Sequence, residues 1–413
     1  MTNQEESTGI HISRSNISVT LLTALFISSI LFSGQLFKPG TENSLALPPA
    51  MQFTASQIPT VAPTWTGTSL PPTEAPTPAY TPTSLPLDSQ PTATPFGLNV
   101  ITLNGTTVEK YGFMVPNDTL FDATNWWSNA IGPSPYGTTT KAVDVYGTNQ
   151  SINGLANITW QGGVIVGSIP PSWTWRETHE YGGGGFFIYN TGPIEWRFIR
   201  IHNVEDGIKL REEPEYSNTG SWVLRDCYFT AIRDDAIDND RFEPGTVQDC
   251  LFDGVYVFLS EQDENVGSNN PIGPDENNSI QIKRIYVRLY GTNDDEGPGK
   301  WFKWQGNVPH HNVVISNSVF AIGSVPRLGW SDETLPPEVR WVGTNNFILW
   351  LGAPGEYGGP KPEGVTFLEG AAARAKWISV RNKWLTDHGL PSQNLPADYN
   401  PHNAPIMQIP TGF

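Results

Sequence analysis

The chain has 413 residues, a formal net charge of −17 and only two cysteines. This acidic balance argues against nucleic acid as a partner, because phosphate binding needs a positively charged face. Two cysteines exclude a disulfide framework and allow one bridge at most.

Residues 1–16 form an N-terminal tail, and residues 17–37 hold no charge and are mostly apolar. Because about 20 apolar residues cross a bilayer, this segment predicts a membrane anchor. It also fits the apolar core of a secretory signal, with a small-x-small cleavage site at residues 44–46. Both alternatives predict that the rest of the chain lies outside the cytoplasm, membrane-anchored or secreted.

Residues 38–96 are rich in proline and threonine. Proline interrupts helix and sheet hydrogen bonding, and this segment has too little apolar surface to form a core. We therefore expect a disordered, extended linker that holds the following domain away from the membrane.

Residues 97–413 are long enough for one large core, and short apolar strands recur within them. Periods of 20–50 residues are typical of stacked repeats, and the shortest step found here is about one coil of a parallel β-solenoid. In this register the two cysteines are neighbours on adjacent coils, either as stacked thiols or as a bridge. The aligned strand centres, separated by 28, 23, 35 and 33 residues, are Ile199, Cys227, Cys250, Ile285 and Ser318.

Each coil contains a second short strand after a tight turn. Its period-2 alternation predicts that Lys209 and Asp238 point outward. The side chains predicted to point inward are Ile208, Ile237 and either Val255 or Val257.

Three longer stretches, 211–221, 260–279 and 291–311, follow these second strands. Equivalent positions stack in a solenoid, so we expect the three insertions to rise from one side and wall a groove.

Near the C-terminus, residues 368–389 have the periodicity of an amphipathic helix that ends at Gly389. We expect this helix to cover the open end of the solenoid, whose edge strand would otherwise favour aggregation. The predicted β-helix domain then spans 97–413, with core coils at about 140–325 and a cap at about 326–413. The residues predicted to share the apolar helix face are Ala373, Trp377, Val380 and Trp384.

The stretches GGVIVGSIPPSWTW, FFIYNTGPIEWRFIRIHNVEDGIKL, AIRDDAIDND and GTVQDCLFDGVYVFLS resemble bacterial proteins of the pectin-lyase-like superfamily. The similarity covers residues 155–388 and includes an Arg-Asp-Asp-x-Ile-x-Asn-Asp stretch, Arg233 to Asp240, of a poorly characterised group. It implies an all-β, single-stranded, right-handed parallel β-helix. The superfamily includes hydrolases, lyases, epimerases and non-catalytic surface proteins, so the resemblance alone fixes no activity. The Gly-His-Gly and Arg-Ile-Lys signatures of its polygalacturonase-like members do not occur here.

Four aspartates occur within seven positions, and they are the candidate catalytic residues. Glycosidic hydrolysis needs one protonated and one ionised carboxyl group. A structural role in turns and a Ca²⁺ site are the alternatives; no other cofactor or metal is expected. The four are Asp234, Asp235, Asp238 and Asp240.

Basic and aromatic residues near the expected groove are candidates for binding a sugar. The basic ones can clamp a uronate carboxylate or act as the base of an elimination, although such residues also serve to offset nearby acids. Exposed indoles stack on sugar faces, but tryptophans also anchor cores. The candidates are Lys209, Arg211, Arg233, Trp301, Lys303 and His310.

These features predict a monomeric, carbohydrate-active protein that hydrolyses or remodels an extracellular polysaccharide. A non-catalytic adhesin or glycan-binding module, with or without Ca²⁺, explains the anchor and linker equally well. A polysaccharide lyase is a second alternative, ranked lower because so acidic a chain lacks the positive charge that neutralises a uronate.

Overall fold

The computed structural model describes twelve parts of the chain, all of them after residue 97. The predicted anchor or signal segment and the linker therefore lie outside the described residues, and no helix within the described parts is long and apolar enough to cross a membrane. The described residues are 98–107, 111–131, 140–147, 157–189, 192–211, 220–240, 242–262, 279–291, 299–304, 310–323, 335 and 338–403.

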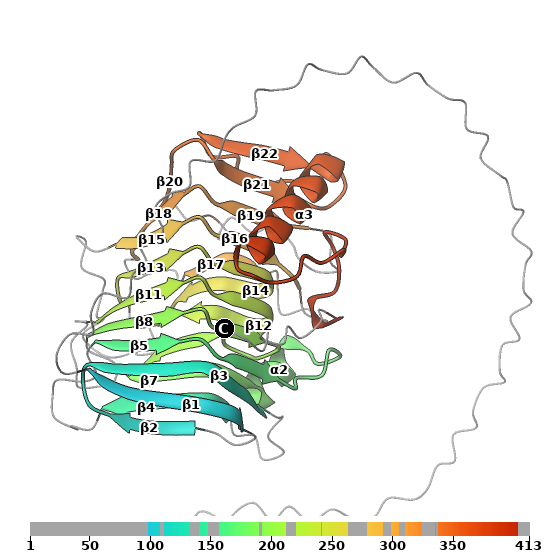
Figure 1. The fold of residues 1–413 in the computed structure, drawn as a ribbon. Helices are drawn as coiled ribbons and strands as arrows, with labels where there is room; N and C mark the ends of the chain where they lie inside the picture. Colours follow the sequence, from blue (N-terminus) through green and yellow to red (C-terminus); the bar gives the residue numbers. More distant parts are fainter. Residues whose placement is uncertain are drawn as a thin grey trace, which may run out of the picture. The chain divides into compact units, whose positions relative to one another are not determined.

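The described strands pair in parallel and stack in three rows, and the coils from β1 to β17 pass through rows one, two and three in turn (Figure 1). This confirms the predicted parallel β-solenoid. Strands β1 (Asn99–Thr107) and β3 (Thr119–Ile131) run through rows one and two at the N-terminal end. Row one continues with β5 (Ile158–Gln161), β8 (Pro193–Arg197), β11 (Ser221–Arg225), β13 (Gly245–Gln248), β15 (Ser279–Lys283), β18 (Asn312–Ser316) and β20 (Val339–Val342).

The other two rows share their two longest strands. β12 (Tyr228–Asp238) and β14 (Leu251–Glu261) begin in row two and end in row three. Row two also contains β6 (Val164–Gly167), β9 (Arg200–His202), β16 (Tyr286–Leu289), β19 (Val319–Ile322), β21 (Asn346–Trp350) and β22 (Val365–Glu369). Row three also contains β2 (Tyr111–Val115), β4 (Thr140–Gly147), β7 (Gly183–Tyr189), β10 (Ile208–Arg211) and β17 (Lys300–Trp304).

The corner between rows one and two repeats in successive coils and confirms the predicted register. Each corner has one residue in the left-handed region, with φ between 51° and 58° at Phe198, Asp226, Asp249, Arg284 and Asn317. The next residue in each coil turns inward and is fully buried. These are the five predicted strand centres, Ile199, Cys227, Cys250, Ile285 and Ser318.

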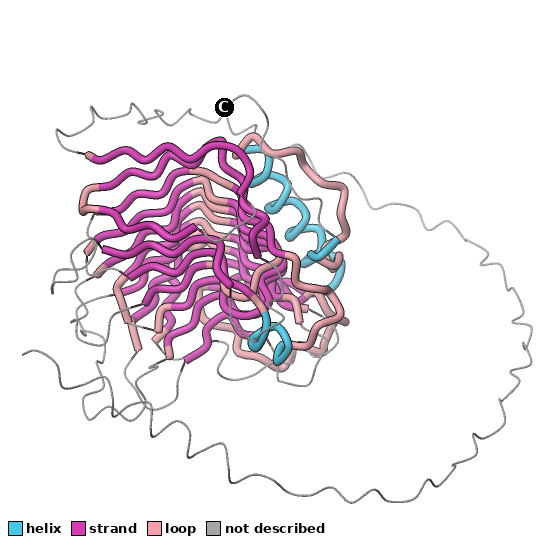
Figure 2. The backbone as a smooth tube through the Cα atoms, turned by 90° about the horizontal axis from the view of Figure 1, so that it is seen from below, coloured by secondary structure: helices cyan, strands magenta, loops and turns pink. Residues whose placement is uncertain are grey.

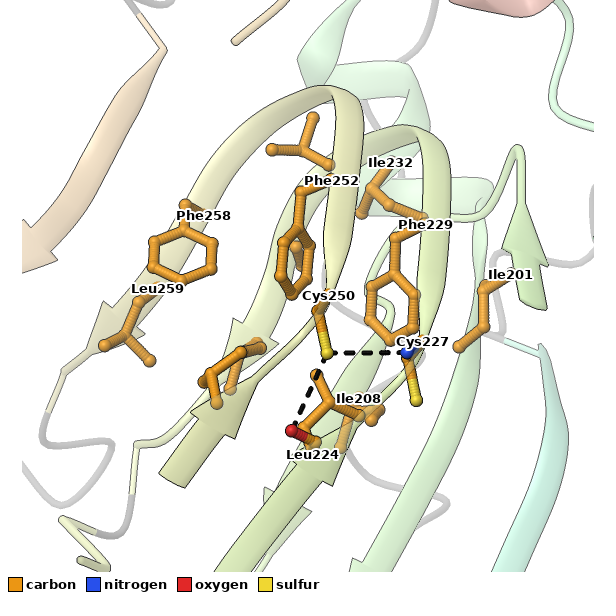
Figure 3. Packing of buried hydrophobic residues seen from close by; sticks show 14 of the residues in the cluster. Ile201, Ile208, Leu224, Cys227, Phe229, Ile232, Cys250, Phe252, Phe258 and Leu259 are labelled. Carbon is orange, nitrogen blue, oxygen red and sulfur yellow. Dashed lines mark hydrogen bonds between the residues drawn. The ribbon is translucent and has the colours of Figure 1, made fainter. Parts of the chain in front are cut away.

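The two cysteines are unbridged and stack within the core. The backbone N–H of Cys227 points at Sγ of Cys250, 3.4 Å away, as Figure 3 shows. The buried rings of Phe229 and Phe252 lie edge to face beside them at 5.1 Å. Of the two structures that the sequence left open for these cysteines, the stacked thiols are the one found.

Strand alternation also places the second strands as predicted. Ile208, Ile237 and Val255 belong to the central apolar cluster. Lys209 pairs in register with Asp238, and these two residues lie on the opposite, outer side of the strands. The direction of both residues is therefore confirmed.

The long C-terminal helix α3 (Gly370–Asp387) lies on a side of the solenoid, so the prediction that it covers the open end is wrong (Figures 1 and 2). Its indoles, Trp377 and Trp384, pack on outward side chains of row two that come from β12, β14, β19 and β21. Those side chains are apolar and need a cover, which is the physical reason for the lateral position. They are Tyr228, Leu251, Val319 and Leu349.

Two further short helices lie in the described chain. α2 (Trp175–Tyr181) begins with a capping box between Thr174 and Glu177, and η2 (Pro401–Asn403) follows α3. Both contact β12, which therefore has its outer side partly covered.

Candidate functional site

The outer side of row three carries a line of polar residues from four consecutive coils. In register, Lys209 of β10 faces Asp238 of β12, which faces Ser260 of β14 and then Lys303 of β17. Lys209 forms an ion pair with Asp238, which is only 1% exposed. The stacking of coils thus brings together residues that are far apart in the sequence.

The third predicted insertion is not a loop over its whole length, because it contains strand β17. Residues 300–304 form a strand that pairs with β14, so Lys303 belongs to the solenoid itself and not to a groove wall. The chain leaves row three after β10 and after β14, as expected. The third insertion instead begins after β16, in row two, so the prediction that all three leave from one side is wrong. The stretches 212–219, 263–278, 292–298 and 305–309, which were expected to wall the groove, lie outside the described residues.

Asp234 and Asp235 lie where β12 bends from row two into row three. Both belong to the strand and not to a turn, and the pairing of the strand with β14 shifts register between Ile232 and Asp235. Nζ of Lys303 lies 2.9 Å from Oδ2 of Asp235 and 3.7 Å from Oδ1 of Asp234. One lysine therefore binds both neighbouring carboxylates.

Asp240 completes the predicted set at the end of the strand. Its Oδ1 accepts the backbone N–H of Gln262 at 2.9 Å, and its Oδ2 lies 3.7 Å from Nζ of Lys209. The structure therefore brings all four predicted aspartates to one side of β12, around Lys209 and Lys303. We call these aspartates, together with Glu205 and Asp206, the carboxyl cluster.

Glu205 and Asp206 were missed from the sequence, although a signal was available. Because Ile208 pairs with Ile237, Asp206 lies one coil before Asp235, and Glu205 one coil before Asp234. Oδ1 of Asp206 accepts the backbone N–H of Asp235 at 3.2 Å. Applying the repeat register to every acidic residue would have found both.

His179 and Trp175 of α2 were also missed, and here the sequence holds no repeat signal. Nδ1 of His179 lies 3.3 Å from Oδ2 of Asp234 and 3.4 Å from Oε1 of Glu205. Nε1 of Trp175 donates to Oδ1 of Asp234 at 2.9 Å. The indole and imidazole rings stack at 4.9 Å, and the His179 side chain is 59% exposed. His179 is thus the most solvent-accessible group in contact with the cluster.

Burial and charge shift the pKa values in the cluster in opposite directions. Burial, followed by the charge of Asp234, raises the pKa of Asp235 to about 7. Burial and the charge of Asp238 raise the pKa of Asp240 to about 9. Burial also acts upward on Asp234, but Lys303, His179 and Trp175 together lower its pKa. Hydrogen bonds to Asp234 and Glu205 raise the pKa of His179 to about 10.

Some carboxylate oxygens in the cluster are buried without a hydrogen-bond partner among the described residues. They are Oε2 of Glu205, Oδ1 of Asp235 and Oδ1 of Asp238. A buried ion pair with a purely structural role normally satisfies such atoms, since each unmet one costs free energy. These three oxygens are able to accept a proton, a cation or a hydrogen bond.

The remaining predicted binding residues lie elsewhere or serve other contacts. Arg233 donates to the Trp173 carbonyl at 2.5 Å and lies 3.0 Å from Nε2 of His402, so it joins η2 to the segment before α2. Trp301 is fully buried in the core, which contradicts the expectation of an exposed indole. Only the backbone of Arg211 is described, in register with Tyr189.

His310 belongs to a second polar cluster, further along β14. Its ring stacks on Trp304 at 5.0 Å, and its Nδ1 lies 3.7 Å from Oε2 of Glu261. Glu261 is fully buried and also binds Nδ1 of His311 at 2.6 Å. Burial acts to raise the pKa of Glu261, but the two histidines lower it overall. These contacts balance a buried charge, and they place His310 apart from the carboxyl cluster.

Comparison with known proteins gives one structural likeness. No protein-family model and no curated protein sequence matches the chain. A solved structure of the Streptococcus pneumoniae surface protein and adhesin PfbA is similar over 66% of this chain and 88% of that chain, with 12% identity and a TM-score of 0.33. A TM-score this low carries no inference about the function of this chain.

Proposed function

We propose that the protein is a carbohydrate-active enzyme that hydrolyses or remodels a polysaccharide outside the cytoplasm, with Asp235 and Asp238 as the reacting carboxyl groups. One observation carries the proposal. In each of these aspartates one carboxylate oxygen forms an ion pair with a lysine, Lys303 for Asp235 and Lys209 for Asp238. The other oxygen is buried and has no hydrogen-bond partner among the described residues.

The spacing of this pair fits glycosidic cleavage. Asp206, Asp235 and Asp238 each offer a carboxylate oxygen within 4.8 Å of the other two. Retaining glycosidases place their two carboxyl groups about 5–5.5 Å apart, whereas inverting ones need about 6.5–9.5 Å for a water molecule. The spacing therefore favours a retaining reaction, in which one aspartate attacks the sugar and the other donates and then accepts the proton.

The charge of the cluster favours a neutral or cationic sugar chain. Six carboxyl groups surround only two lysines and His179. A uronate would meet uncompensated negative charge there, and a lyase needs that charge neutralised. A hydrolase acting on a neutral polymer fits better than a polysaccharide lyase.

The test is the release of reducing ends by the full-length protein from a panel of neutral polysaccharides, with the isosteric variants Asp235→Asn and Asp238→Asn beside it. Each variant is expected to lose at least about 100-fold in rate, because a catalytic acid or base contributes about 10²–10⁴-fold and without the nucleophile no covalent intermediate forms. Glu195→Gln is the control, because Glu195 pairs with Arg197 on the outer side of row one, outside the cluster. Thermal unfolding shows that each variant is folded.

The adhesin alternative is favoured by one feature of the site, since every carboxyl side chain of the ion pairs is at most 8% exposed. A binding module needs no access to these groups. If the wild-type protein retains a glycan in a pull-down but releases no product from any polymer, the enzyme proposal is wrong and the module is supported.

A further inference from the structure

The exposed side of the carboxyl cluster has the form of a three-ligand metal site. Nδ1 of His179, Oε1 of Glu205 and Oδ2 of Asp234 come from α2, from the segment before β10 and from the bend of β12. One ligand atom from each residue lies within 4.8 Å of the other two. Three separate elements thus direct one nitrogen and two oxygens at a common point.

The distances are long for charge-assisted hydrogen bonds, and they match the separation between two ligands of one metal ion. A charge-assisted N–H···O contact is usually about 2.7–2.9 Å long. The imidazole nitrogen instead lies 3.3 Å from Asp234 and 3.4 Å from Glu205. Two ligand atoms bound at about 2.1 Å to one ion are separated by about 3.0–3.4 Å at octahedral to tetrahedral angles.

Two further observations point to a ligand at this place. Glu205 is 3% exposed, and its Oε2 is buried without a hydrogen-bond partner among the described residues. The Trp175 N–H fixes the far oxygen of Asp234 at 2.9 Å, as outer hydrogen bonds orient metal-binding carboxylates. Since His179 is 59% exposed, solvent or a substrate hydroxyl can reach the open coordination positions.

We propose that His179, Glu205 and Asp234 bind a divalent first-row transition cation, Zn²⁺ or Mn²⁺, at the exposed side of the carboxyl cluster. Imidazole suits Zn²⁺ and carboxylates suit Mn²⁺, whereas Ca²⁺ takes six to eight oxygens and gains nothing from an imidazole. The bound cation joins α2 to the bend of β12. This inference is independent of the proposed hydrolysis, because cation binding is measured directly.

The experiment titrates the full-length protein, treated with EDTA and dialysed, with ZnCl₂, MnCl₂ and CaCl₂ by calorimetry. Binding of one Zn²⁺ per chain is expected, with weaker Mn²⁺ binding that is also visible by electron paramagnetic resonance, and no Ca²⁺ binding at His179. His179→Gln is expected to weaken Zn²⁺ binding by at least about 100-fold. Trp175→Phe, which removes only the outer hydrogen bond, should weaken it by about 10-fold.

His388→Gln is the matched control. His388 lies 3.2 Å from Oδ1 of Asp226, so it is a histidine beside one carboxylate and not two. Its variant should bind Zn²⁺ like the wild type. Glu205→Gln, a second ligand variant, should lose binding as His179→Gln does.

Two results would overturn the inference. One is Zn²⁺ and Mn²⁺ affinity that His179→Gln and Glu205→Gln leave unchanged. The other is a preference for Ca²⁺ that depends on Asp206 and Asp238, because the cation would then occupy the all-oxygen group of Asp206, Asp235 and Asp238.

Discussion

Asp253 shows how strongly a single buried charge depends on its partners in this protein. It is fully buried, lies 2.5 Å from Nε of Arg288, and accepts the hydroxyl of Tyr399 at 2.8 Å. Arg288 is itself 1% exposed. Removing one partner of a buried pair leaves the other charge uncompensated, which costs far more than the loss of a surface pair.

We therefore expect Asp253→Asn to lower the free energy of unfolding by about 3–5 kcal/mol, measured by urea denaturation. Asp249→Asn is the matched control, since Asp249 pairs at 2.6 Å with Arg284, whose side chain is 51% exposed. The control should cost less than about 1 kcal/mol. Equal losses in the two variants would contradict the assignment of Asp253 as a buried anchor.

His202 gives the fold a pH dependence of defined sign. Burial lowers its pKa from 6.5 to about 4, and its Nδ1 lies 2.7 Å from the hydroxyl of Thr230. Below pH 6.5 the unfolded chain takes up a proton that the folded chain rejects until about pH 4. Stability is therefore present above this range and is lost as the pH falls through it.

The measurement compares urea denaturation of the wild type and of His202→Gln at pH 7 and pH 4.5. Glutamine keeps a polar partner for Thr230 but does not titrate. The wild type should lose about 1–3 kcal/mol more than the variant over this interval, less than the full shift would allow. If the two proteins lose the same amount, His202 does not titrate as the structure indicates.

At the scale of elements, the sequence predicts the features that recur from coil to coil, and it does not predict the elements that occur once. The inward residues from Ile199 to Ser318 follow from a stacking register, because coils of similar length must align their apolar positions. The same register brings Asp238 to Lys209. The seven residues of α2 are too few for a helical periodicity to appear, so its contacts with Asp234 could not be foreseen.

The position of α3 was missed for a different reason. Its apolar face was identified, but which surface it covers depends on the outward side chains of row two, such as Leu251 and Val319. Strand alternation predicts which side chains point inward, but it does not predict which of the outward ones are apolar and need a cover. Arg381, fully buried on the same helix, was not foreseen either, because its contacts are carbonyls of the later segment, such as that of Leu395 at 2.8 Å.

Gly254 lies in β14, where the strand packs against Pro401 of the C-terminal segment, and it allows a test of this contact. It has a φ of +89°, and a Cβ there would lie 2.4 Å from side-chain atoms of Pro401. Gly355 has a similar φ of +84° with open space around it, so it reports backbone strain alone. The difference between alanine variants at the two sites therefore measures the packing of η2.

Both Gly254→Ala and Gly355→Ala should lose about 1–2 kcal/mol through left-handed strain. Only Gly254→Ala should also release the segment around Pro401, seen as faster hydrogen exchange at residues 396–403. Unchanged exchange at this segment in Gly254→Ala would mean that Pro401 does not pack against the strand.

At the scale of the whole described solenoid, α3 connects coils that are not neighbours. A stack of repeats unfolds by nearest-neighbour steps, so damage to a terminal coil normally stays local. Here the helix begins next to β22, and its far end binds earlier coils. Nε1 of Trp384 donates to the Asp249 carbonyl at 2.8 Å, and His388 lies 3.2 Å from Asp226. The helix thus links β21 and β22 to the coils of β12 and β14.

This linkage predicts that a terminal cavity is felt several coils away. Ile348 of β21 is fully buried, so Ile348→Ala removes core packing from a terminal coil at a cost of about 2–5 kcal/mol. With α3 in place, hydrogen exchange should accelerate together in all coils beneath the helix, from β12 to β22. In the Trp384→Ala background, where the far end of the helix is released, the same substitution should accelerate exchange only in β19 to β22. An identical exchange pattern in the two backgrounds would show that the coils communicate through strand stacking alone, and that α3 is a passive cover.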